Sequence, residues 1–183
     1  MKVLRMRQIE VKNIRIGDQI IIPLAEFGEF TATAQKITDK GTLFLFDSCV
    51  ARQSMNNKCT NEGGFDNSDL KKWIDNVLLP AFPDNLRSRI ENLTIPTDGQ
   101  IFGHDVWYNI EPDNDEQFPL MTKRKNRIAD FENEYNWYWL QNVTNDNGGL
   151  YAAYFANVTG GGAAEYGCAS YSHGVRPVFL LVD

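Results

Sequence analysis

The chain has 183 residues, a net charge of −6 at neutral pH and an aromatic share of 12%. This length favours a single domain, and so large an aromatic share is not that of a disordered chain. The acidic balance argues against a nucleic-acid partner, because phosphates demand basic patches. No apolar stretch is long enough to predict membrane insertion.

The first third of the chain is predicted to form β-strands separated by turns. Residues 7–14 and 30–37 alternate apolar and polar positions, and residues 19–24 and 42–46 are short apolar runs. Short strands with turn residues between them are typical of antiparallel sheet. We therefore predict an N-terminal β segment within residues 1–60.

Two helices are predicted in the middle of the chain. The first follows Asn67 or Ser68, either of which can cap it, and ends at Pro80. A shorter helix begins at Pro83 and ends before Thr94. The apolar side chains repeat with the spacing of core-facing helices. They are Leu70, Trp73, Ile74, Val77 and Leu78 in the first helix, and Leu86 and Ile90 in the second.

Regular patterns fade over residues 97–136, as in long loops. Buried strands are then predicted at residues 137–140, 154–158 and 175–182. Strands, two helices, a loop-rich insert and further strands predict one α+β domain over residues 1–183, with antiparallel sheets and long irregular loops.

The cysteines and the first fifteen residues indicate in which cellular compartment the chain is made. Cys49, Cys59 and Cys168 are an odd number without the spacing of a zinc site or the density of a disulfide framework. Reduced thiols are therefore expected, with a Cys49–Cys59 bridge left open. The first fifteen residues lack the apolar segment of a signal peptide, so we expect synthesis in the cytoplasm.

The last 47 residues, 137–183, differ in composition from the rest of the chain. They hold five of the seven tyrosines and seven of the fourteen glycines, but only one basic residue, Arg176. Tyrosine, serine, glycine and asparagine are the residues that evolved binding surfaces use most. We therefore predict a loop-borne ligand-binding region on a rigid frame.

Several motifs of this region resemble the C-terminal signature of a C-type-lectin-fold family that includes the variable proteins of diversity-generating retroelements. The motifs are Trp137-Tyr138-Trp139-Leu140, Phe155-Ala156-Asn157-Val158, Ala169-Ser170 and Gly174-Val175-Arg176-Pro177-Val178-Phe179. The resemblance implies a C-type lectin fold that displays a hypervariable C-terminal face. It also implies a phage or prophage setting, with a virion as one place of action, and a role in receptor recognition.

The sequence departs from the family pattern at Tyr138 and at Gln141-Asn142, where Trp and Arg-Ser are common. In the family, a reverse transcriptase rewrites adenines, and asparagine codons changed in this way never encode Glu, Lys, Gln, Met or Trp. Between Asn142 and His173 only Glu165 belongs to that forbidden set. The run therefore has the composition that adenine mutagenesis would produce.

The predicted ligand-binding residues come from this run. They are Tyr151, Tyr154, Thr159, Tyr166, Cys168, Tyr171 and His173, followed by Asn145, Asp146, Ala153, Gly161 and Gly167. The aromatic residues would be the anchors, since tyrosine and tryptophan dominate interface hot spots. The expected partner is an unnamed protein or glycan on a cell surface. No catalytic residue, metal or cofactor is predicted.

Other aromatic and apolar residues of the region are assigned to the scaffold. These are Trp137, Trp139, Phe155, Val158, Val175, Pro177 and Phe179. Arg176 is predicted to be structural, because an arginine between core residues usually donates its fork of N–H groups to carbonyls or a carboxylate.

Three alternatives remain open. A calcium-dependent lectin would use acidic loops such as residues 111–116, since Ca²⁺ is coordinated by several oxygen ligands. An enzyme would have to use His104 or His173 as a base, and no catalytic motif accompanies them, although a Cys–His pair with Cys49 or Cys168 remains open. A structural virion or surface subunit would use the same aromatic face for assembly, because interfaces also favour exposed tyrosine and tryptophan.

Overall fold

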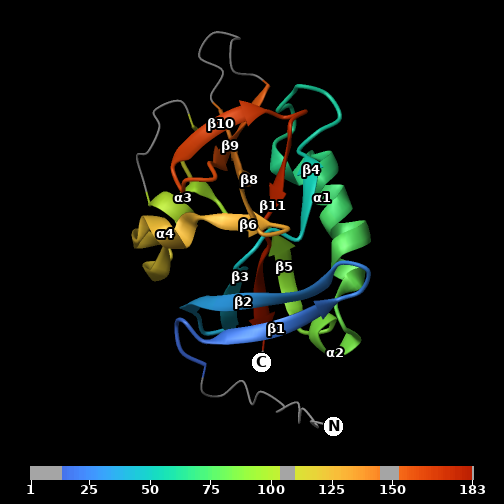
Figure 1. The fold of residues 1–183 in the computed structure, drawn as a ribbon, viewed down its shortest axis with the longest axis vertical. Helices are drawn as coiled ribbons and strands as arrows, with labels where there is room; N and C mark the ends of the chain where they lie inside the picture. Colours follow the sequence, from blue (N-terminus) through green and yellow to red (C-terminus); the bar gives the residue numbers. More distant parts are fainter. Residues whose placement is uncertain (1–13, 104–109, 145–152, 183) are drawn as a thin grey trace.

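The computed structural model describes residues 14–103, 110–144 and 153–182. Within them the chain forms two five-stranded sheets and a separate hairpin, with short helices between the strands. Figure 1 shows the first sheet in the lower half of the molecule and the second in the upper half. The predicted strand over residues 7–14 lies almost wholly outside the described residues.

The first sheet is antiparallel throughout, in the order β1-β2-β3-β12-β5. Its strands are β1 (Gln19–Leu24), β2 (Gly28–Ile37), β3 (Gly41–Phe46), β12 (Val178–Val182) and β5 (Ile90–Thr94). In β1 every second residue is buried, as expected of a strand with one face on the core. The three strands predicted between residues 19 and 46 are therefore confirmed.

The second sheet has the order β10-β9-β8-β11-β4 and carries most of the C-terminal motifs. Its strands are β10 (Ala164–Cys168), β9 (Tyr154–Val158), β8 (Tyr138–Val143), β11 (Ser172–Val175) and β4 (Ala51–Ser54). Only β8 and β11 pair in parallel, through Tyr138 and Gly174. A two-stranded hairpin, β6 (Ala129–Phe131) with β7 (Glu134–Asn136), precedes β8.

Among the described residues, part of the tyrosine- and glycine-rich run that was predicted as loop forms strands. β10 and β11 lie within it, and β10 pairs along its whole length with β9. The loop prediction failed because strands pair through backbone N–H and C=O groups. Small side chains leave these groups free to pair, even though they give no strand pattern in the sequence.

The first predicted helix is confirmed, although its form changes along its length. It runs through α1 (Asp69–Trp73), a π-helical turn η3 (Ile74–Leu78) and a 3-10 turn η4 (Leu79–Ala81). Ser68 caps it by accepting a hydrogen bond from the Lys71 amide.

The second predicted helix is confirmed only as the single turn α2 (Asp84–Arg87). Residues 90–93 were predicted to be the end of this helix, which is wrong, because they form β5 with Thr94 at the edge of the first sheet. Pairing with β12 overrides the helical spacing of Leu86 and Ile90.

More short helices are present than the two predicted. They are α3 (Asp98–Phe102), α4 (Arg124–Arg127) and the 3-10 turns η2 (Phe65–Asn67) and η5 (Pro119–Thr122). Thr97 and Gln100 form a capping box at α3. Figure 1 shows α1 and α2 along one side of the molecule and α3 and α4 on the other.

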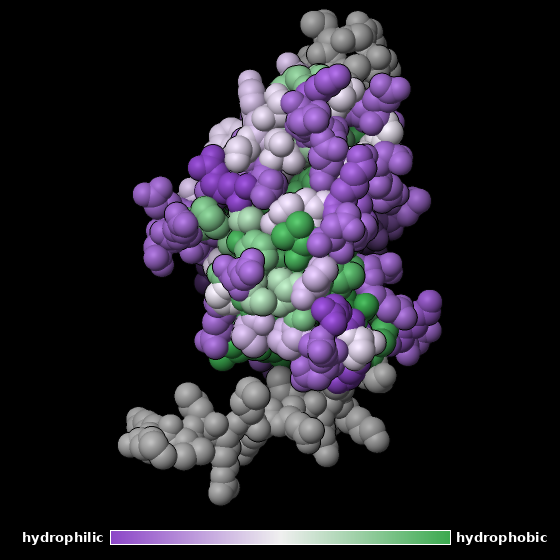
Figure 2. Space-filling model, turned by 90° about the vertical axis from the view of Figure 1, so that its right-hand side faces the viewer, coloured by the Kyte–Doolittle hydropathy of each residue, from purple (hydrophilic) through white to green (hydrophobic). Residues whose placement is uncertain are grey.

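Two hydrophobic clusters hold the sheets and helices together. The larger cluster joins Phe44 and Phe179 of the first sheet to Trp139 of the second and to Leu70 of α1. The smaller one packs α3 and η5 against the opposite face of β8 and β9. On the side that bears α1, hydrophobic residues show midway up the surface, and hydrophilic residues dominate above them (Figure 2).

The predicted terminal strand over residues 175–182 is broken in two. β11 ends at Val175 in the second sheet, and β12 begins at Val178 in the first, so that Arg176 and Pro177 carry the chain between sheets. Arg176 is 3% exposed and donates to the carbonyls of Phe46 and Asn126 and to the Tyr138 hydroxyl. Its predicted structural role is thus confirmed.

The α+β class is confirmed, with antiparallel pairing dominant. In the described part of the chain, no helix is long and apolar enough to cross a membrane.

Candidate ligand-binding site

A pocket of about 530 Å³ opens on the second sheet. We call it the aromatic pocket. It collects residues from β4, β7, β10 and β11 and from the start of β8. The lining residues are Arg52, Asn136, Trp137, Tyr166, Gly167, Tyr171, Ser172 and His173.

Exposed aromatic rings form the walls of the pocket. Trp137 is 41% exposed and Tyr171 is 57% exposed, which is unusual for such large apolar side chains. His173 lies between them, with ring centroids 5.7 Å from Trp137 and 6.2 Å from Tyr171. The three rings therefore lie next to one another at the pocket, with Tyr171 edge-on to His173.

Trp139 packs against the ring of His173. Its ring is fully buried, and its centroid lies 4.4 Å from that of His173. The indole N–H donates to the carbonyl of Gln53 in β4, at 2.9 Å. The amide of Gly174 donates to the carbonyl of Trp137 at 2.6 Å, which fixes β11 against the start of β8. The walls are thus anchored to a rigid frame.

Two nearby groups control the protonation of His173. Burial and, to a smaller extent, the positive charge of Arg52 together lower the pKa of His173 to about 4, against the opposing effect of a backbone hydrogen bond at Ser172. The imidazole is therefore neutral at neutral pH. Arg52 itself donates to the carbonyl of Ser172 at 3.0 Å, and it is the only charged residue in the lining.

A polar residue lies buried behind the pocket. Asn157 in β9 is fully buried, although its neighbours Phe155, Ala156 and Val158 are all apolar. Neither polar atom of its side chain has a hydrogen-bond partner among the described residues, and the same is true of His173 Nε2. A side chain at Gly167 would reach to 3.0 Å from Asn157 Nδ2 and 3.4 Å from His173 Nε2.

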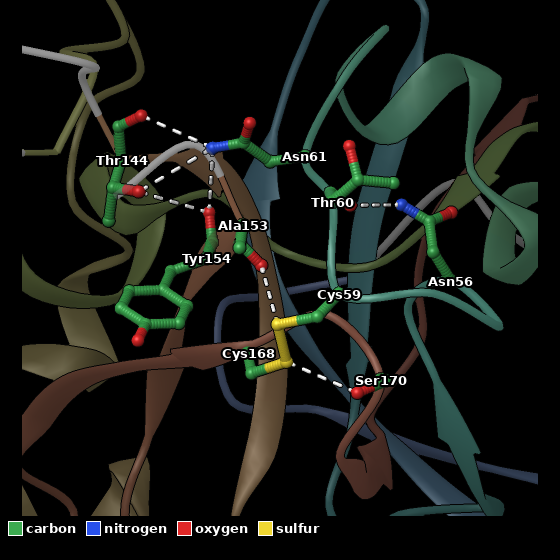
Figure 3. Close-up of a disulfide and its surroundings, with 9 residues drawn as sticks. All are labelled: Asn56, Cys59, Thr60, Asn61, Thr144, Ala153, Tyr154, Cys168 and Ser170. Carbon is green, nitrogen blue, oxygen red and sulfur yellow. Dashed lines mark hydrogen bonds between the residues drawn. A yellow bond between two sulfur atoms is a disulfide. The ribbon is translucent and has the colours of Figure 1, made fainter. Parts of the chain in front are cut away.

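A disulfide joins Cys59 to Cys168 beside the pocket, with Cα atoms 5.5 Å apart (Figure 3). The expectation of reduced thiols is therefore wrong, as is the alternative Cys49–Cys59 bridge. Spacing could not reveal the pair, because 109 positions separate the two cysteines and only the fold brings them together. Cys49 is free and buried, and burial raises its pKa to about 12.

The loop that carries Cys59 is also tied to the second sheet by hydrogen bonds. The Asn61 side chain donates to the carbonyls of Thr144 and Tyr154 (Figure 3). The backbone amide of Asn56 donates to the carbonyl of Ala169. Together with the disulfide, these contacts hold the ends of β9 and β10 in place.

The structure brings four of the predicted binding residues into the pocket lining: Tyr166, Gly167, Tyr171 and His173. Tyr154 adjoins them, because its ring stacks on Tyr166 at a centroid distance of 5.9 Å. Tyr151, Asn145 and Asp146 lie outside the described residues.

The remaining predicted binding residues are placed elsewhere. Thr159 and Gly161 lie in the turn between β9 and β10, where the Gly161 carbonyl accepts from Arg124. Cys168 is bonded to Cys59, and the Ala153 carbonyl accepts a backbone hydrogen bond from Ala169.

Four lining residues escaped prediction, namely Arg52, Asn136, Trp137 and Ser172, as did the buried Asn157 beside the pocket. Trp137 was assigned to the scaffold, but it lies outside β8 with its ring at the pocket. Arg52 comes from a part of the chain that showed no binding pattern. Asn157 did give a signal, since it is a polar residue in a buried apolar strand.

The acidic loop that favoured a calcium-dependent lectin is engaged in local hydrogen bonds. Asp113 accepts from the Gly99 amide and from the Asn142 side chain. Within the described ranges, no three His, Cys, Asp or Glu side chains are placed to hold a metal ion.

Comparison with known families adds one result. Residues 40–182 match a family described as a domain of unknown function, DUF6273. The chain belongs to the DUF6273 family. The DUF6273 region contains every residue of the pocket lining, both bonded cysteines and Asn157, whereas β1 and β2 precede it. No curated protein and no solved structure matches the chain.

Proposed function

We propose that this DUF6273 protein binds a ligand through the aromatic pocket, without catalysing a reaction. The observation that carries the proposal is the convergence of Trp137, Tyr166, Tyr171 and His173 on one pocket. Exposed aromatic rings on a rigid frame give large contact area at low entropic cost, which is the usual design of a recognition surface.

We further propose that the domain is of C-type-lectin type and that a diversity-generating retroelement varies its pocket. The pocket residues within the C-terminal run are Tyr, Gly, Ser and His, all of which adenine mutagenesis can produce. Trp137 and Arg52 lie outside that run and would be constant. The partner would be a protein or glycan on a cell surface, met by a phage or surface protein.

Two experiments test these proposals separately. For retroelement variation, the gene's genomic neighbourhood is sequenced. A reverse transcriptase gene and a template repeat that differs only at adenines, including the codons of Tyr166, Tyr171 and His173, would support it. A neighbourhood without both would refute it.

For ligand binding, fluorescently labelled protein is applied to candidate host cells, and retention is compared with that of Tyr171→Ala. Loss of retention in this variant, with unchanged thermal stability, is the expected result. The exposed Tyr135, which is 77% exposed and outside the pocket lining, supplies the control variant Tyr135→Ala. Equal retention of all three proteins would contradict the proposal.

A further inference from the structure

The Cys59–Cys168 disulfide reaches the aromatic pocket at the middle of its wall. Five of the eight lining residues lie within five positions of Cys168 along the chain. Two precede it in β10, and three follow it in the turn and in β11. They are Tyr166, Gly167, Tyr171, Ser172 and His173. Cys168 therefore joins the two parts of the wall, and its sulfur is bonded to a different segment of the chain.

The disulfide is the only covalent restraint on this part of the wall apart from the chain itself. β10 is at the edge of the second sheet and pairs with β9 on one side, and no strand of the described residues pairs with its other side. The loop that carries Cys59 reaches the turn after β10 by one printed backbone bond, from the Asn56 amide to the Ala169 carbonyl. The Asn61 side chain bonds to Thr144 and Tyr154, near the ends of β8 and β9, and so does not hold β10.

The two sulfur atoms of the bond lie in different surroundings. Cys59 is exposed, whereas Cys168 is 8% exposed. Exposed disulfides are the ones that thiols reduce readily, and a thiolate attacks the sulfur that it can reach. An attacking thiolate therefore meets Cys59, and Cys168 is the leaving group.

Ser170 is placed to assist this departure. Its hydroxyl oxygen lies 3.1 Å from Cys168 Sγ and is the donor, because a disulfide sulfur carries no hydrogen (Figure 3). Hydrogen bonds to a charged acceptor are stronger than those to a neutral one, so the bond strengthens as Cys168 becomes a thiolate. A stabilised leaving thiolate speeds the exchange.

We propose that the Cys59–Cys168 bond is a redox switch for the aromatic pocket, with Ser170 assisting its opening. With the bond formed, the wall is ordered and the pocket binds its ligand; with the bond reduced, β10 and the following turn loosen and binding is lost. This inference rests on the proposed ligand-binding function and concerns its regulation. The pocket is then inactive in a reducing cytoplasm and active in oxidising surroundings.

The reductant is a dithiol. One of its thiolates attacks Cys59 Sγ and forms a mixed disulfide while the Cys59–Cys168 bond breaks, and Cys168 leaves as a thiolate that takes a proton from water. The second thiolate of the reductant attacks its own sulfur in the mixed disulfide and releases Cys59, which is protonated in the same way. Two electrons pass to the protein, and the reductant becomes a cyclic disulfide.

Hydrogen–deuterium exchange of the full chain tests the structural half of the switch. After reduction with dithiothreitol, amides in residues 164–175 should exchange about tenfold faster, while those in residues 19–46 keep their protection. The double variant Cys59→Ser/Cys168→Ser should match the reduced protein and should not respond to dithiothreitol, since Cys49 is free. Equal protection of residues 164–175 in the oxidised and reduced proteins would overturn the proposal.

Cell retention tests the functional half. The oxidised wild type should be retained and the double serine variant should not, without any reductant reaching the cells. Full retention of the double variant, with retention lost in Tyr171→Ala, would overturn the switch and leave the proposed function standing. If Tyr171→Ala is retained like the wild type, the proposed function fails, and the exchange measurement still decides whether the bond orders the wall.

The rate of reduction tests the part assigned to Ser170. Dithiothreitol should reduce Ser170→Ala several-fold more slowly than the wild type, with unchanged amide protection in the oxidised state. Ser88→Ala is the control, because Ser88 is exposed at the end of α2, in the lower part of the molecule (Figure 1). Reduction of Ser170→Ala at the wild-type rate would overturn the role of Ser170.

Discussion

Asn157 is a buried polar residue whose side-chain atoms have no hydrogen-bond partner among the described residues. Its position in β9 is fully buried, and a leucine would continue the apolar strand. Leaving a buried polar group unpaired costs about 1–3 kcal/mol. Proteins retain such groups where activity needs them, which is why stabilising substitutions at functional sites often reduce function.

His173 gives a prediction at the same scale. Its pKa is about 4 in the folded chain and 6.5 for a freely hydrated histidine, so the folded state binds fewer protons between these values. The contribution to stability is therefore complete above pH 6.5 and is lost as the pH falls through 4. Because the side chain is partly exposed, we expect a loss on the order of 2 kcal/mol.

The measurement is urea unfolding at pH 7 and pH 4.5 for the wild type and His173→Gln. The difference between the two proteins should shrink as the pH falls. Asp98 titrates in the same window in the opposite sense, since burial and then Asp113 raise its pKa to about 6. Only the comparison between variants isolates the histidine, and a pH-independent difference would contradict its neutral, buried state.

At the scale of elements, strands marked by a run of apolar residues were predictable and those defined by pairing were not. β1 and β9 have their predicted bounds, because a short apolar run bounded by turn residues indicates a buried strand. β5 was taken for helix, because its strand character depends on β12, which lies far along the chain. β10 was taken for loop, because glycine and alanine carry little strand propensity of their own.

The site was predictable to a similar extent. Tyrosine content identified Tyr166 and Tyr171, since exposed aromatic residues mark binding surfaces. Arg52 and Trp137 were not found, because pocket membership depends on how β4 and the start of β8 meet β11. Composition describes a segment, whereas a pocket is formed by several segments at once.

The division between frame and surface can be tested with two truncations. Trp139 is fully buried and bonded to Gln53, so Trp139→Ala should lower the free energy of unfolding by about 3–5 kcal/mol. Tyr171 is exposed, so Tyr171→Ala should change it by less than about 0.5 kcal/mol. Chemical denaturation measures both, and the reverse order would mean that surface and frame are assigned wrongly.

The whole molecule is held together across long stretches of sequence. Cys59 and Cys168 join the loop after β4 to the end of β10. A cross-link between such distant residues restricts the unfolded chain strongly, and native disulfides typically contribute about 2–4 kcal/mol. Disulfides persist in oxidising compartments, so this bond favours action outside a reducing cytoplasm.

Alkylation and thermal melting test the Cys59–Cys168 disulfide and the burial of Cys49. Iodoacetamide should not modify the native protein, because Cys49 is buried with a raised pKa and the other two cysteines are bonded. After unfolding without reductant, one cysteine should react, and after reduction all three should. Cys59→Ser with Cys168→Ser should lower the melting temperature by several degrees. Two or more reactive cysteines in the unfolded, unreduced chain would contradict the bond.

The position of β12 in the first sheet has a consequence for the order of events during synthesis. β3 and β5 belong to the same sheet only through β12, which the ribosome makes last among the strands. At a synthesis rate of about 5–20 residues per second, β12 is completed roughly 7–26 seconds after β3. Through that interval Phe44 and Phe46 lack Phe179, the ring that packs against both in the finished domain. Phe44 and Phe46 therefore lack this contact until nearly all of the described chain has been synthesised.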